Sequence, residues 1–145
     1  MKMTFIALFI TFLMANCQLK TSQEITLEIP KLEGKWKLAK IVIGYPFPNG
    51  PTEYKPTYEE ILEFNRSKNT FIHTKDGKVI ETISLKISNL IYGNNSTRDT
   101  LVFENDNTYS FYSFTENPVY LVLYERTPVG AILADGNSYY YEKIK

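Results

Sequence analysis

A short alternating segment near the middle of the chain constrains the fold more than any other feature. Residues 79–88, VIETISLKIS, place Ile83, Leu85 and Ile87 at every second position, with polar residues between them. In an extended strand, successive side chains point to opposite faces. The segment therefore predicts a β-strand with one buried face and one solvated face, as in an antiparallel sheet.

Tight turns separate this strand from its neighbours. Asp76-Gly77 directly precedes it, and TFIHT at 70–74 precedes the turn. A two-residue type I′ turn needs positive φ at both central positions, which Asp-Gly tolerates well, so the pair predicts a β-hairpin. The asparagine and aspartate at 105–107 predict a second turn in the same way. Residues 58–64 carry both helical and strand signals, and the adjoining turn and strand favour a strand there.

The whole body of the chain follows this pattern, without a convincing apolar period of 3.6 residues. Aromatic residues make up 14% of the chain, including 11 Tyr and 9 Phe, and these residues favour strands. We expect about eight antiparallel strands, which can close into a barrel or stack as a sandwich. The short sequential hairpins favour an all-β, up-and-down β-barrel, because closure leaves no exposed edges. Two longer loops are expected at 44–56 and 126–137.

Length and charge limit the classes of function. The 145 residues suit one domain, and Lys plus Arg and Asp plus Glu both number 16. A chain with no basic excess and no basic run is not expected to bind nucleic acid. A single cysteine excludes an internal disulfide and any metal site built from cysteines. No dinucleotide fingerprint, phosphate-binding loop or zinc spacing occurs, so we expect no cofactor and no metal.

The first residues resemble a bacterial lipoprotein signal peptide. Lys2 is followed by the apolar run FIALFITFLMA, residues 5–15, which is shorter than the about 20 residues that span a bilayer. The sequence LMANC, ending at Cys17, is similar to a lipobox. The resemblance implies removal of residues 1–16 and lipidation of Cys17. The alternative is that Cys17 is an ordinary buried thiol behind a secretory signal.

The same resemblance implies a location and a domain organisation. Residues 17–30 then form the lipidated cysteine and its tether, and residues 31–145 form the barrel. Acyl chains on Cys17 attach such a protein stably to a membrane. Gln18, in place of an aspartate after the cysteine, implies the outer membrane. No acidic export signal follows, so the periplasmic face is expected.

The predicted first strand carries a second resemblance. LEGKWKL, residues 32–38, contains Gly34-x-Trp36, with the only tryptophan of the chain. Lipocalins and their relatives begin the barrel with Gly-x-Trp, and the chain is similar to small lipocalin-like lipoproteins of Bacteroidetes over residues 32–144. The resemblance implies that Gly34 admits the chain tightly and that Trp36 covers the closed end of the barrel.

The aromatic and aliphatic residues raise the question of whether the barrel is hollow. Eight strands leave room either for packed side chains or for one small ligand. If it is hollow, the protein binds a small hydrophobic molecule, and the predicted interior residues are Trp36, Leu38, Phe64, Leu85, Phe111 and Leu123. If it is filled, outward-facing aromatics and loops dock a partner, which the sequence does not identify. Both interpretations remain open at this stage.

Candidate catalytic residues are few, and we expect no enzyme. His73 is the only histidine, and no nucleophile motif accompanies it. A place on a strand, on the wet face or near the hairpin, is the simpler interpretation. The acidic residues Glu53, Glu59, Glu60 and Glu63 lack the spacing of a calcium loop. They are expected to form a solvated face.

Overall fold

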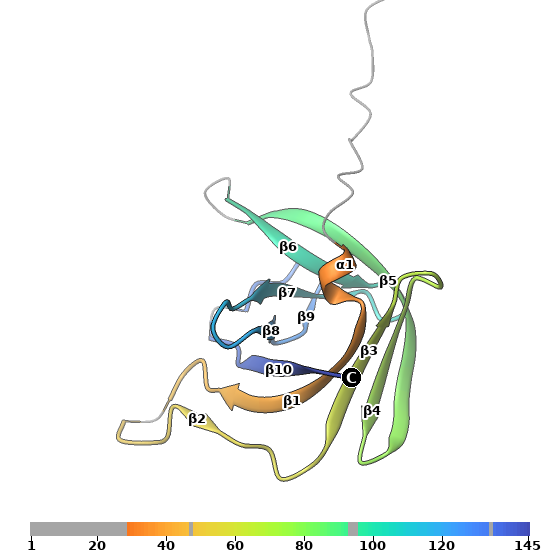
Figure 1. Cartoon of the computed structure of the whole chain (residues 1–145). Coiled ribbons are helices and arrows are strands. Elements are labelled where there is room, and N and C mark those ends of the chain that lie inside the picture. The colour runs from red at the N-terminus through yellow and green to blue at the C-terminus, as the bar shows by residue number, and fades with distance from the viewer. Residues whose placement is uncertain (1–28, 47, 93–95, 134) are drawn as a thin grey trace, which may run out of the picture.

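The computed structural model describes residues 29–46, 48–92, 96–133 and 135–145 and shows an all-β molecule (Figure 1). One short helix, α1 (Ile29–Leu32), precedes the strands. The strands are β1 (Gly34–Val42), β2 (Glu53–Tyr54), β3 (Glu60–Asn65), β4 (Thr70–Lys75), β5 (Lys78–Tyr92), β6 (Ser96–Phe103), β7 (Thr108–Phe114), β8 (Tyr120–Tyr124), β9 (Thr127–Pro128) and β10 (Ser138–Ile144). The predicted signal peptide, Cys17 and most of the tether lie outside the described residues.

Eight of these strands close into an antiparallel barrel. Sequential pairing runs β1-β3-β4-β5-β6-β7-β8-β10, and β10 pairs back with β1. The closing register sets Lys35 opposite Ile144 and Val42 opposite Ser138. Neighbours in sequence are neighbours in the barrel, so the expected up-and-down topology is confirmed. β2 and β9 are two-residue additions inside the two predicted loops, paired with β1 and β7 respectively.

The local signals act as the sequence predicted. Asp76 and Gly77 have φ values of 48° and 74°, as the tight turn between β4 and β5 requires. Asp76 also fixes this turn to the start of β3: its carboxylate accepts the Glu59 backbone N–H at 2.9 Å, and its own N–H donates to the Glu59 carbonyl at 2.8 Å. Residues 60–65 are a strand, not a helix, because Leu62 and Phe64 alternate into the core.

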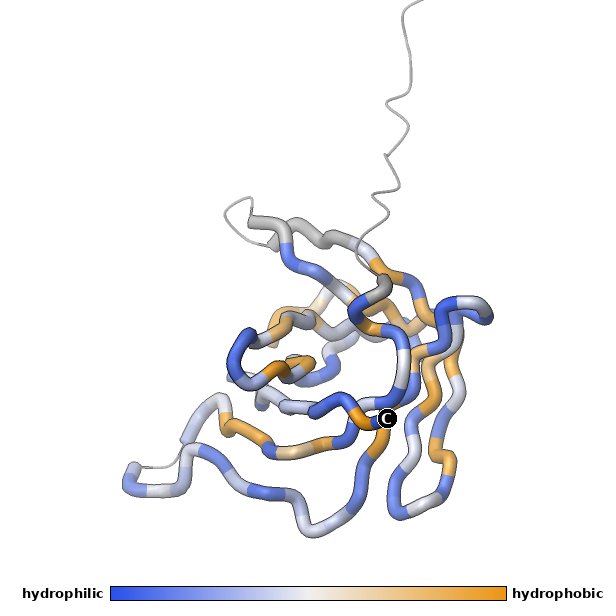
Figure 2. The backbone as a smooth tube through the Cα atoms, in the orientation of Figure 1, coloured by the Kyte–Doolittle hydropathy of each residue, from blue (hydrophilic) through white to orange (hydrophobic). Residues whose placement is uncertain are grey.

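Alternation divides every wall of the barrel into an inner and an outer face. Hydrophobic and hydrophilic residues alternate along the strands in Figure 2. The inner face carries a continuous core that includes Trp36, Leu62, Phe71, Leu101 and Leu121. Its aromatic rings meet at tilted or edge-on angles, with Phe71 5.3 Å from both Phe64 and Phe103 between ring centroids.

The beginning of the barrel is its closed end. Gly34 enters β1 with a φ of 110°, a conformation that side chains with a Cβ rarely adopt. Two residues on, Trp36 is 1% exposed, and its indole N–H donates a 2.7 Å hydrogen bond to the Leu32 carbonyl of α1. Leu32 is itself buried, and the Phe114 ring lies 5.8 Å from the indole. Helix and indole thus seal this end of the barrel.

Candidate binding pocket at the open end

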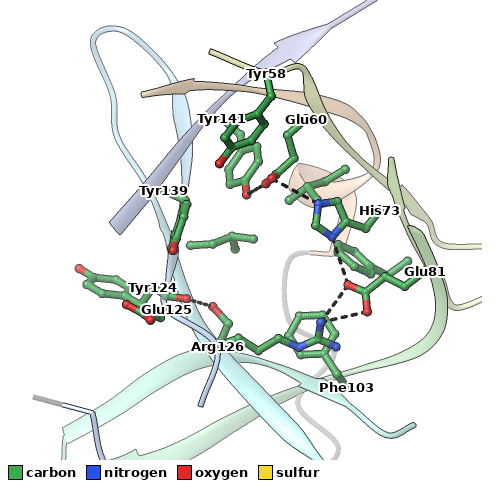
Figure 3. A pocket seen from close by; sticks show the side chains of 14 residues that line it. Tyr58, Glu60, His73, Glu81, Phe103, Tyr124, Glu125, Arg126, Tyr139 and Tyr141 are labelled. Carbon is green, nitrogen blue, oxygen red and sulfur yellow. Dashed lines mark hydrogen bonds and ion pairs between the residues drawn. The ribbon is translucent and has the colours of Figure 1, made fainter. Parts of the chain in front are cut away.

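The opposite end of the barrel holds a cavity of about 390 Å³ (Figure 3). It lies where β1, β4, β6 and β8 end and where β3, β5, β7 and β10 begin. Seven of the eight barrel strands contribute to its walls, as do the residues after β8. The lining residues are Tyr58, Glu60, Leu62, Phe71, His73, Glu81, Phe103, Ser110, Leu123, Tyr124, Glu125, Arg126, Tyr139 and Tyr141. The barrel is therefore filled at one end and hollow at the other.

Glu60 is the most buried carboxylate of the pocket. It shares the inner face of β3 with Leu62 and Phe64, and the Tyr141 hydroxyl donates a 2.6 Å hydrogen bond to its Oε1. Burial alone would raise the pKa of Glu60, but its interactions with His73 and Tyr141 outweigh burial and lower it. Burial, and then the charge of Glu60, raise the pKa of Tyr141 well above its usual value. Glu60 is therefore a carboxylate and Tyr141 a neutral donor.

A β-bulge brings His73 to face Glu81. The Asp76-Gly77 turn pairs Lys75 with Lys78 and Thr74 with Val79, and a regular register would continue with Ile80 opposite His73. The bulge between His73 and Thr74 shifts that register by one residue, so His73 lies opposite Glu81. Both side chains then point inward, with His73 Nδ1 3.2 Å from Glu81 Oε1.

His73 lies between two carboxylates, which favour the protonated form of its imidazole. Its Nε2 is 3.4 Å from Glu60 Oε2, without the alignment of a good hydrogen bond. Burial lowers the pKa of His73, but Glu60 and then Glu81 outweigh burial and raise it above its ordinary value. The three side chains therefore pair by charge when the imidazole is protonated.

Arg126 continues the charged wall beyond Glu81. Its Nη1 donates to both Glu81 oxygens, at 2.8 and 3.1 Å, and its Nε donates to the Thr108 hydroxyl at 2.7 Å. Its Nη2 lies 3.1 Å from Asp106 Oδ2, and its guanidinium stacks 3.8 Å from the centroid of Phe103. One ionic chain thus runs Glu60–His73–Glu81–Arg126–Asp106 along one side of the pocket.

The other side of the pocket is aromatic and aliphatic. Leu123 lines the cavity, and Tyr139 and Tyr141 project inward from β10 (Figure 3). Burial raises the pKa of Tyr139 and that of Tyr58, so both phenols are neutral. A ligand here meets mainly aromatic and aliphatic surface, together with Glu125, on this side and the ionic chain on the other.

The residues predicted for the interior separate into three groups. Leu123 lines the cavity. Trp36, Leu38 and Phe64 are buried in the core below it, and Leu85 packs against that core partly buried. The predicted interior position of Phe111 is wrong. Tyr112 and Phe114 take the inward positions of β7, and Phe111 lies on the opposite face. There it contacts Tyr109 at 5.2 Å and Arg98 at 5.3 Å.

Sequence reasoning missed the charged wall, although a signal was present. Glu60 belongs to the same alternating set as Leu62 and Phe64, His73 follows Phe71 by two positions, and Glu81 precedes Ile83 by two. A charged residue in phase with an apolar face marks an inward charge. The predicted solvated acidic face is correct for Glu53, Glu59 and Glu63, which pair with Lys40, Lys37 and Lys35 at the surface. It is wrong for Glu60, which is 8% exposed.

Two further observations concern the class of protein. The described part of the chain contains no group of three or more potential metal ligands, and none of its helices has the length and apolarity to cross a bilayer. No family model, curated protein or solved structure matches the chain. The fold and the pocket therefore define it as a small closed β-barrel with a cavity at one end.

Proposed function

We propose that this protein binds a small molecule in the open-end cavity. The observation that carries the proposal is the cavity itself, whose volume of about 390 Å³ lies within the range of small-molecule sites. Such sites usually combine an apolar and aromatic lining with a few fixed polar groups. The bound molecule would place a hydrophobic body against Leu123 and Tyr139 and a polar group toward Glu60 and His73.

The proposal includes attachment to the cell envelope as a lipocalin-like lipoprotein. Its support is the lipobox-like sequence at Cys17 and the Gly34-x-Trp36 motif, whose glycine has positive φ and whose indole is buried at the closed end. The described chain begins at α1, beside that end. A tether from Cys17 would join the barrel opposite the cavity and leave its mouth facing away from the anchor.

Fractionation tests the anchoring separately from binding. Cys17→Ser removes the only thiol and should move the protein from the membrane fraction to the soluble periplasmic fraction. The expected site of the wild type is the periplasmic face of the outer membrane. A Cys17→Ser protein that still sediments with membranes would contradict lipid attachment and leave the binding proposal standing.

Native mass spectrometry tests the binding. The Cys17→Ser protein, purified from its own envelope, should show an extra mass under gentle spray that denaturation removes. Leu123→Trp should abolish the extra mass because the larger side chain occupies the cavity, whereas Phe111→Ala, on the outer face of β7, should retain it. Equal native and denatured masses, together with no ligand recovered by solvent extraction of the purified protein, would contradict the proposal.

A second candidate function is docking of an envelope protein. Loops at the open end expose large apolar side chains, with Tyr45 74% and Ile132 71% exposed. Single exposed apolar residues are normal on protein surfaces, but here several lie around one mouth. Crosslinking in the intact envelope should capture one partner repeatedly through these loops, and Tyr45→Ser with Ile132→Ser should remove it. Failure to capture any recurrent partner would reject this alternative.

A further inference from the structure

We propose that the ligand of the open-end pocket carries a protonated amine on an aromatic or aliphatic body. This inference rests on the proposed binding function and names the chemical class of the ligand. Its basis is the balance of charge around the cavity. Three carboxylates line the cavity, those of Glu60, Glu81 and Glu125, whereas His73 and Arg126 are its cationic lining residues.

Both cations already have carboxylate partners. The Glu81 oxygens receive Arg126 Nη1 and His73 Nδ1, and Asp106 lies beside Arg126 Nη2. The ionic chain therefore begins and ends on a carboxylate. Glu125 adds a further carboxylate to the lining, and its Oε2 accepts a hydrogen bond from the Asn137 backbone N–H at 2.8 Å. A ligand carboxylate would enter an environment that already has an excess of negative charge.

Glu60 has an acceptor that a ligand can use. Among the described residues, the Tyr141 hydroxyl donates to Oε1, whereas Oε2 has only the 3.4 Å, poorly aligned contact from His73. A ligand ammonium can supply a shorter, better aligned, charge-assisted hydrogen bond to Oε2. We therefore assign Glu60 as the principal partner of the amine, with Glu81 close by on the same wall.

The aromatic lining suits the same ligand class. Rings of this pocket already hold cations, with the Arg126 guanidinium 3.8 Å from the Phe103 centroid and Lys75 Nζ 3.9 Å from that of Tyr58. Tyr139 and Tyr141 bring two further rings to the cavity wall. The face of an aromatic ring attracts a cation, and the attraction is stronger where water is excluded.

The position of His73 predicts how binding depends on pH. The groups that face it are Glu60 from β3 and Glu81 from β5; behind them lie Tyr141 and Arg126, and Lys75 is on its own strand. A ligand cation at Glu60 competes with the imidazolium for the same carboxylate. Binding should therefore release a proton from His73 and strengthen as pH rises through the titration of His73. An anionic ligand would show the opposite slope.

Three probes that share a phenylethyl-type body isolate the charge. Calorimetric titration of the Cys17→Ser protein, stripped of any ligand, compares 2-phenylethylamine, 2-phenylethanol and phenylacetate at about pH 6 and about pH 8. We expect the amine to bind roughly tenfold or more tightly than the alcohol, a difference of about 1.4 kcal/mol, and phenylacetate to bind most weakly. The affinity of the amine should be higher at the higher pH.

Matched variants test the assigned carboxylate. Glu60→Gln should lower the affinity for the amine roughly tenfold and leave the affinity for the alcohol unchanged. Glu63→Gln is the control, because Glu63 is on the same strand but pairs with Lys35 outside the barrel. If Glu60→Gln does not fold, Glu125→Gln provides a second test. It should lower the affinity for the amine by a smaller factor.

The outcomes separate this inference from the binding function. Tighter binding of phenylacetate or equal binding of amine and alcohol would overturn the amine assignment while supporting the pocket. If no probe binds, the natural ligand released in native mass spectrometry decides: a basic amine supports the inference, and a ligand without one overturns it. If no probe binds and no natural ligand is found, the binding function itself fails.

Discussion

The two ends of this barrel use the same alternating strands for opposite purposes. At the closed end, Trp36 and Leu32 are each 1% exposed and joined by a hydrogen bond, so indole and helix fill the interior. At the open end, the same inward positions carry Glu60, His73 and Glu81 around a cavity. A change of residue type at inward positions, without any change of architecture, separates a packed core from a binding pocket.

Trp36→Ala should produce the largest effect, and it breaks the closed end. Removing a fully buried indole costs about 3–5 kcal/mol of unfolding free energy, since the surrounding core cannot fill the cavity that remains. Urea unfolding measures this loss, and Trp36→Phe should recover part of it. A loss below about 1 kcal/mol would show that the closed end does not depend on this plug.

Tyr141→Phe should produce a smaller loss that originates at the open end. The phenol donates a buried hydrogen bond to the Glu60 carboxylate at 2.6 Å, and removing such a donor costs roughly 2 kcal/mol. The pKa of Glu60 should rise, which NMR titration of the carboxyl carbon detects. Tyr140→Phe, at the neighbouring position on the outer face, is the control and should change neither quantity.

Gly34→Ala tests the entry to the closed end without touching the pocket. An alanine at a φ of 110° is strained, and the expected cost is roughly 1–2 kcal/mol. Lys35→Ala, at the next position, should have little effect. Ligand binding by the folded fraction should be unchanged in both variants, and a large loss of affinity in Gly34→Ala would mean that the two ends are coupled.

The pH dependence of stability is the smallest effect, and it belongs to the open end. Because the pKa of His73 is raised, its stabilising contribution is complete below the unfolded-state value of 6.5 and is lost as pH rises through the folded-state pKa. Because the pKa of Glu60 is lowered, its contribution is present above 4.5 and is lost as pH falls through the folded-state pKa. Stability should be greatest between these two limits.

His73→Gln isolates the histidine part of this dependence. The difference in unfolding free energy between wild type and variant, measured in urea from about pH 5 to about pH 9, should shrink as pH rises. Asn69→Gln, in the turn before β4, is the control outside the pocket. Its difference in unfolding free energy from the wild type should not change with pH in this way. A difference that stays constant or grows with pH would contradict the charged state assigned to His73.

Much of the fold could be predicted from local chemistry. The Asp76-Gly77 turn needs only two residues of the right conformational freedom, and the alternation at Ile83, Leu85 and Ile87 needs only a buried face. Both signals lie within a few residues of sequence, and the structure confirms both. Closure of the barrel could also be predicted from the sequence, because short successive hairpins leave few other ways to protect the edge strands.

The pocket depended on less local features. The bulge at His73 and Thr74 places Glu81, instead of Ile80, opposite His73 on the neighbouring strand. Alternation alone does not encode such a one-residue register shift. Arg126 reaches Glu81 from the region after β8, 45 residues away in sequence. Phe111 was assigned to the wrong face because both alternating sets on β7 contain aromatic residues, so neither set is distinguished by hydrophobicity.

The single tryptophan and the single histidine mark opposite ends of the barrel, and one experiment can follow both. In ¹⁵N-labelled Cys17→Ser protein, 2-phenylethylamine should shift the imidazole resonances of His73 and leave the indole Nε1–H resonance of Trp36 in place. That result would establish a solid closed end and a binding open end. Equal shifts at both residues, or no shift at His73 on adding the amine or the natural ligand, would contradict the account.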